Sequence, residues 1–140
     1  KQAGLTRFIA ICLLTGYIWL GISGLSAMWF GAVPVGPRYD ATLHTFFLGF
    51  VFAMIFAHAP IIFPAVLGAR MAYRPLFYAH VVLLQVTLVV RLIGDAAGWI
   101  AGRQVGGLLN AVTLLLFLVN TVSALRSPPE RAGAVQTRAS

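Results

Sequence analysis

One apolar stretch, residues 41–67, constrains this chain more than any other feature. Its sequence, ATLHTFFLGFVFAMIFAHAPIIFPAVL, is long and apolar enough to cross a bilayer whose hydrocarbon core is roughly 30 Å thick. It carries two of the three histidines, His44 and His58. On an ideal helix, 14 residues fall about 40° short of four full turns and rise about 21 Å. We therefore predict that both imidazoles share one helix face, near opposite sides of the membrane.

Composition places the whole chain in the same class. Of its 140 residues, 60% are hydrophobic and 9% are charged, and the mean hydropathy is +0.91. A soluble domain of this size cannot bury so much apolar surface, so we predict an all-α integral membrane protein. The formal net charge is +7, but the basic residues flank apolar spans. We interpret them as topology determinants and not as a nucleic-acid-binding surface.

The pattern of apolar runs predicts a four-helix transmembrane bundle. Turn-forming Pro and Gly residues separate the runs and predict the connections. The four helices are expected over about residues 8–33, 41–67, 76–100 and 108–125. Together they form one transmembrane domain, residues 1–125, followed by a polar tail, residues 126–140. Gly49, Ala53 and Ala57 lie at four-residue spacing and predict a close helix–helix contact.

Basic residues are distributed unequally between the two ends of the predicted spans. Seven of them fall on the side that holds both termini and the loop at 68–75: Lys1, Arg7, Arg70, Arg74, Arg126, Arg131 and Arg138. Arg38 and Arg103 fall on the other side. Because cytoplasmic loops carry the excess of Lys and Arg, both termini are predicted to be cytoplasmic. The expected location is a bacterial-type inner (cytoplasmic) membrane, with several passes.

The third histidine predicts a cofactor site. A hairpin centred on Ala69 pairs positions whose numbers sum to about 138, which places His58 and His80 at the same depth. Two histidines facing each other at one depth are typical of a bis-histidine haem b. We therefore predict that the chain binds one or two haems b. The alternative is that a histidine in a span merely hydrogen-bonds a neighbouring helix.

Two charged residues extend this prediction along helix 76–100. Arg91 is 11 residues after His80 and shares its face, and Asp95 is one turn further, level with about His44. Arg91 is expected to bind a haem propionate and Asp95 to orient His44. An equally weighted alternative is that Arg91 and Asp95 neutralise each other as an i,i+4 pair. A proton relay through these residues also remains open.

Other chemistries find little support in the sequence. His44 lies too far from His58 for all three histidines to bind one ion, and no His/Cys cluster has zinc spacing. No hydrolase or kinase motif is present. The single cysteine, Cys12, lies in the first apolar run and is expected to be a packed, inert thiol.

The stretch LHTFFLGFVFAMIF, followed by FPAVLGARMAY, resembles two groups of membrane proteins. It is similar to the second transmembrane helix of haem–copper oxidase catalytic subunits, and to the NnrS family of haem- and copper-containing proteins linked to nitric oxide stress. The resemblance covers helix 41–67 and the next loop, with a weaker match at Arg91 and Leu92. It implies that His44 binds haem iron, with Met28 or an open position opposite. Copper is a possible second metal, but no ligand cluster supports it.

Haem–copper oxidases have many more helices and a four-histidine centre, which this chain lacks. We therefore predict a redox or electron-transfer subunit and not a self-contained enzyme. The expected role is electron transfer or handling of a diatomic gas (NO or O₂), with membrane lipids and other subunits of a redox complex, or further copies of the chain, as partners. The alternative is a cofactor-free accessory subunit of a respiratory or photosynthetic complex. A third reading is a small proton- or quinone-linked carrier.

Overall fold

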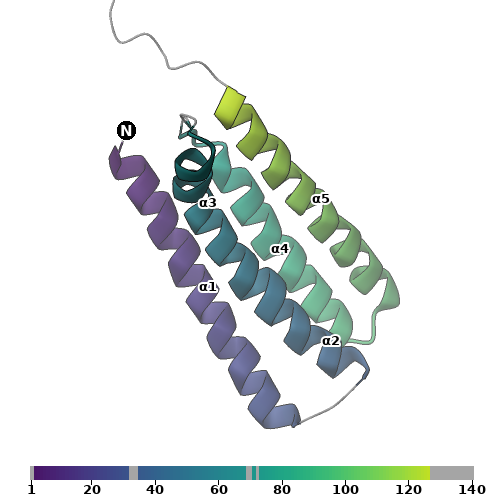
Figure 1. Ribbon diagram of the computed structural model, residues 1–140. Coiled ribbons are helices and arrows are strands. Elements are labelled where there is room, and N and C mark those ends of the chain that lie inside the picture. Colours follow the sequence, from purple (N-terminus) through teal and green to yellow (C-terminus); the bar gives the residue numbers. More distant parts are fainter. Residues whose placement is uncertain (1, 32–34, 69–70, 72, 127–140) are drawn as a thin grey trace, which may run out of the picture.

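The computed structural model describes residues 2–31, 35–68, 71 and 73–126. Its order is α1 (Gln2–Phe30), α2 (Pro37–His44), the π-helix η1 (Thr45–Val51), α3 (Phe52–Leu67), α4 (Phe77–Ala96) and α5 (Ile100–Arg126). Helices α2, η1 and α3 continue into one another as a single span. Figure 1 shows the spans side by side, with the start of α1 and the end of α5 at the same end.

The described residues contain four spans that are long and apolar enough to cross a membrane. They cover Ala3–Phe30, Pro37–Leu67, Phe77–Ala96 and Ile100–Arg126. The all-α class and the four apolar spans are therefore confirmed. Much of the outer surface is apolar, as lipid contact requires; Leu25 is 68% exposed and Leu115 is 63% exposed. Cys12 is fully buried, as expected.

Several helix boundaries differ from the prediction. The second span begins at Pro37 and not at 41, because Pro37 follows Gly36, whose φ is 101°, and a proline suits the first helical position. The first and third helices are Gln2–Phe30 and Phe77–Ala96, where we predicted 8–33 and 76–100. Of the predicted tail, Arg126 belongs to α5, and residues 127–140 lie outside the described residues.

The predicted connection between the third and fourth helices, residues 101–107, is wrong, since α5 already begins at Ile100. The chain reverses instead at Gly98, whose φ is 65°. The Trp99 N–H donates to the Gly94 carbonyl at 2.9 Å, the hydrogen bond of a Schellman motif. The glycines of α5 serve the contact with α4. A Cβ on Gly106 would lie 3.0 Å from the Arg91 Cα, so the two backbones pack directly together.

The small-residue face of the second span makes a close helix–helix contact, and the helix that it packs against is α1. Gly49 lies under the Trp19 ring, since a Cβ there would lie 2.5 Å from Trp19 Cγ. Gly16 of α1 approaches Ala53 in the same way. Trp19 also donates a hydrogen bond from Nε1 to Gln85 Oε1 on α4, so this tryptophan ties three spans together.

Candidate functional site

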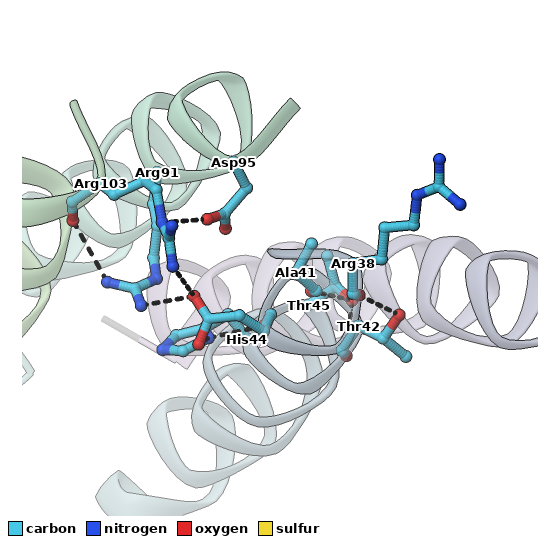
Figure 2. A network of polar contacts seen from close by, with 9 residues as sticks. Arg38, Ala41, Thr42, His44, Thr45, Arg91, Asp95 and Arg103 are labelled. Carbon is cyan, nitrogen blue, oxygen red and sulfur yellow. Dashed lines mark hydrogen bonds and ion pairs between the residues drawn. The ribbon is translucent and has the colours of Figure 1, made fainter. Parts of the chain in front are cut away.

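Charged side chains gather at the end of the bundle where α2 meets the α4–α5 hairpin. They come from three helices: Asp40 and His44 from α2, Arg91 and Asp95 from α4, and Arg103 from α5. Figure 2 shows the last four of these side chains converging. Asp40 and Asp95 are the only acidic residues in the part of the chain that the structure describes. Two carboxylates and two guanidinium groups balance, so the cluster is neutral when His44 is neutral.

Asp40 is the centre of this cluster. Its Oδ2 lies 2.7 Å from Arg91 Nη2 and 3.9 Å from Arg103 Nη2. Its Oδ1 lies 3.3 Å from His44 Nδ1. The backbone carbonyl of Asp40 lies 2.7 Å from the same nitrogen. Because a carbonyl only accepts, Nδ1 of His44 carries the proton, and Nε2 of the neutral ring has its lone pair free.

Arg91 and Asp95 therefore contact other side chains than the sequence suggested. Asp95 Oδ1 lies 2.6 Å from Arg103 Nε, and Arg91 Nη1 donates to the Arg103 carbonyl at 3.3 Å. Each aspartate thus pairs with an arginine of another helix, and the i,i+4 pair does not form. Asp40 and not Asp95 holds His44. The i,i+4 spacing of Asp40 and His44 was the signal in the sequence that could have identified this contact.

His80 occupies an aromatic enclosure toward the other end of the bundle. Its ring centroid lies 4.7 Å from that of Phe56, 5.3 Å from Phe117, 5.9 Å from Phe77 and 6.3 Å from Phe8. These rings come from all four spans. His80 is 1% exposed, and the space beside it has no room for a water molecule. All four spans therefore meet at this histidine.

The hydrogen bonding of His80 differs from that of His44. The Asn120 side chain places Nδ2 at 3.5 Å from His80 Nδ1, so Nδ1 accepts a long hydrogen bond. The neutral ring then carries its proton on Nε2, which has no hydrogen-bond partner among the described residues. Sequence reasoning missed Asn120, which is one of several polar residues in α5 and is 7% exposed.

His58 lies on the outside of the bundle. Its Nδ1 is 2.7 Å from the Met54 carbonyl one turn earlier, and the residue is exposed. As for His44, this hydrogen bond leaves Nε2 with a free lone pair. Phe56 and not His58 faces His80. The predicted depth of His80 relative to the second span is therefore correct to within two residues. The prediction that His58 and His80 face each other is wrong.

The π-helix explains why His58 turns outward. A π turn takes about one residue more than an α turn, so the chain beyond η1 lags by roughly 100° relative to an ideal α-helix. The expected angle of about 40° between His44 and His58 becomes roughly 140°. The prediction that both histidines share one face is therefore wrong, because it assumed α geometry through Thr45–Val51.

Comparison with known proteins gives the chain a family. A family model described as a domain of unknown function, DUF8744, matches residues 1–126. The chain belongs to this family. No curated protein and no solved structure matches it. The resemblance to the NnrS family and to haem–copper oxidases stays a prediction.

The described residues do not form a haem pocket between His58 and His80. One histidine faces outward, and the other is enclosed with no free space beside it. No group of three or more His, Cys, Asp or Glu side chains converges on a possible metal position in the described part of the chain. The nitrogens with free lone pairs are Nε2 of His44 and Nε2 of His58, both on the second span.

Proposed function

We propose that this chain is a subunit of a membrane redox assembly and supplies His58 as a haem ligand at its lipid-facing surface. The single observation that carries the proposal is the position of this imidazole. His58 is six residues, or about 9 Å, beyond residue 52, the midpoint of the second span, and so within a hydrocarbon core roughly 30 Å thick. Among the residues that the structure describes, it has no hydrogen-bond partner except its own helix.

An exposed imidazole at this depth is costly unless something covers it. Ionisable residues in spans are rare, usually face a protein interior, and mark functional sites. The neighbours of His58 on the outer surface are apolar; Ile55 is 39% exposed and Ile61 and Ile62 are each 51% exposed. A partner subunit, or a second copy of this chain, would cover this surface and provide the opposite side of the haem pocket.

The local geometry of His58 suits metal binding. Histidines that bind metals donate their other ring nitrogen to a carbonyl or carboxylate, which fixes the tautomer and the ring orientation. Nδ1 of His58 donates to the Met54 carbonyl in this way. A b-type haem bound there would supply one-electron transfer, or binding of NO or O₂ if one axial position stayed open. The chain would provide an axial nitrogen and apolar surroundings.

His44 is the candidate for a second haem. Its Nδ1 meets the carbonyl and carboxylate of Asp40, so its Nε2 is also oriented for a ligand. In this proposal Arg91 acts through its ion pair with Asp40, and Asp95 acts through its ion pair with Arg103. These contacts hold the end of α2 in place. His80 binds no metal, because its enclosure is full.

The test is a reduced-minus-oxidised visible spectrum of the protein purified in mild detergent with its native partners, with the haem quantified as pyridine haemochrome. The α band of haem b is expected to disappear in His58→Ala if the chain binds one haem, or to fall by about half if His44 holds a second one, and to persist in His80→Gln. Loss of about half of the haem in His44→Ala identifies a second haem there. Protein that retains its partners and carries no haem contradicts the proposal, as does a band that depends on His80 alone.

A cofactor-free accessory subunit is the second candidate. Gly21 and Gly24 favour it, since a Cβ at either position would meet no atom of the described residues within 4 Å. Such bare glycines let another helix approach closely. Gly21→Leu with Gly24→Leu would then release the partner without changing any spectrum, whereas the haem proposal expects His58 substitutions to change the spectrum.

A further inference from the structure

A cavity of about 180 Å³ opens between α1, α2 and α4, at the same end of the bundle as the charged cluster. Its walls are mainly apolar and include Ile22 and Phe30 of α1, Ala41 of α2 and Leu92 of α4. Two charged side chains also line it, Asp95 and Arg38. None of the three histidines does, so the proposed haem ligands themselves lie outside the cavity.

Asp95 brings an unused hydrogen-bond acceptor to this cavity. Its side chain is 3% exposed, and Oδ1 is engaged by Arg103 Nε at 2.6 Å. Oδ2 is buried and has no partner in the described part of the chain. A buried carboxylate oxygen without a donor is costly, and a ligand with a donor group would relieve that cost.

The charges around the cavity indicate what net charge a ligand that donates this hydrogen bond should have. Arg103 already neutralises Asp95, and Arg38, exposed at the rim, has its guanidinium 5.2 Å from the Phe30 ring centroid. A cationic ligand would meet two guanidinium groups, and an anionic ligand would meet the carboxylate. A neutral molecule that donates one hydrogen bond from an apolar body fits both conditions.

We infer that this cavity binds a neutral apolar molecule through one hydroxyl group, which donates to Asp95 Oδ2. The class includes phenols and hydroquinones, which are aromatic, and long-chain alcohols, which are aliphatic. The position of the cavity beside the last turn of α4 and the first turn of α2 puts it near one membrane surface. An amphipathic molecule can enter there from the lipid with its hydroxyl leading.

The experiment uses a photoreactive phenol, 4-(trifluoromethyldiazirinyl)phenol, on the full chain in detergent, with adducts mapped by mass spectrometry. Adducts are expected on the cavity walls of α1 and α4, and an excess of 4-propylphenol should compete with labelling. Its methyl ether, 4-propylanisole, lacks the donor and should compete at least about tenfold less well, as the loss of one hydrogen bond to a charged group predicts. Competition by 1-octanol equal to that by 4-propylphenol assigns an aliphatic ligand, and weaker competition assigns an aromatic one.

Two variants test the residues. Asp95→Asn should reduce the preference for the phenol over its ether, because the acceptor loses its charge. Ala96→Leu fills the cavity from α4 and should reduce labelling at least fivefold, whereas Ala101→Leu, at an exposed alanine of α5 outside the cavity, should not. Labelling spread over the lipid-facing surface, equal competition by phenol and ether, or equal labelling of both leucine variants overturns the inference.

Discussion

Asp40 joins α2 to both helices of the α4–α5 hairpin through one carboxylate. Its contacts with Arg91, Arg103 and His44 make it the residue on which the charged cluster depends. Its side chain is 27% exposed and that of Arg91 is 15% exposed, so the pair is partly shielded from solvent. Removing one member of such a pair leaves the other charge uncompensated.

Asp40→Ala should lower the free energy of unfolding by about 1–3 kcal/mol, between the values for exposed and buried ion pairs. Thermal unfolding in detergent measures the loss, and a double-mutant cycle with Arg91→Gln isolates the pair. Arg38→Gln, at the same end of the bundle but outside the cluster, is the control. Additive effects of Asp40→Ala and Arg91→Gln would show that the pair contributes nothing.

At the scale of the elements, glycines have opposite roles in different helices. Gly106 of α5 lies against the Arg91 backbone, where a Cβ would come within 2.9 Å of the Arg91 Cβ. Gly21 of α1 also lies within a helix, but a Cβ there would meet no atom within 4 Å in the described part of the chain. Replacing each of these glycines by alanine therefore distinguishes the effect of helix propensity on stability from the effect of helix packing.

Gly106→Ala should destabilise the protein by about 1–3 kcal/mol, because α4 and α5 must move apart. Gly21→Ala should stabilise it by up to about 1 kcal/mol, because alanine restricts the unfolded backbone. Thermal unfolding of both variants under one condition provides the measurement. A gain in stability from Gly106→Ala would mean that the close contact between α4 and α5 is absent.

The π-helix provides another test among the elements. Deleting Phe47, which is 51% exposed, should convert η1 to α-helix and rotate α3 by roughly 100°. Phe56 would then leave the enclosure of His80, at a cost typical of losing a buried aromatic side chain, about 3 kcal/mol or more. Phe47→Ala removes the same ring without the rotation and should change stability by no more than about 0.5 kcal/mol. Equal effects on the unfolding temperature would argue against the rotation.

The orientation of the four spans in the membrane is a property of the whole molecule. The excess of basic residues predicts that both termini and the 68–75 loop lie in the cytoplasm. In a Cys12→Ser background, an impermeant maleimide added to intact cells should label Val35→Cys and not Pro75→Cys. Permeabilised cells should show labelling of both, since both positions are exposed. The reverse pattern in intact cells would invert the predicted orientation.

Long-range features of the sequence were sufficient to predict the overall architecture. Apolar runs long enough to span a bilayer identify the spans, because no other environment accommodates them. Short connections then make neighbouring spans antiparallel, which is why the depth of His80 could be estimated from residue numbers. The same reasoning placed Gly49 and Ala53 in a helix contact, since small residues let backbones approach.

The tertiary structure alone decided which way the side chains point. A π-helix has no simple sequence signature. Its extra residue rotates α3 by roughly 100°, so that Phe56 and not His58 lies opposite His80. The partner of Arg91 was equally beyond sequence reasoning, because a long arginine side chain reaches Asp40 on another helix as easily as Asp95 on its own. Local periodicity thus determined which segments cross the membrane, and packing between helices decided which ionisable groups meet.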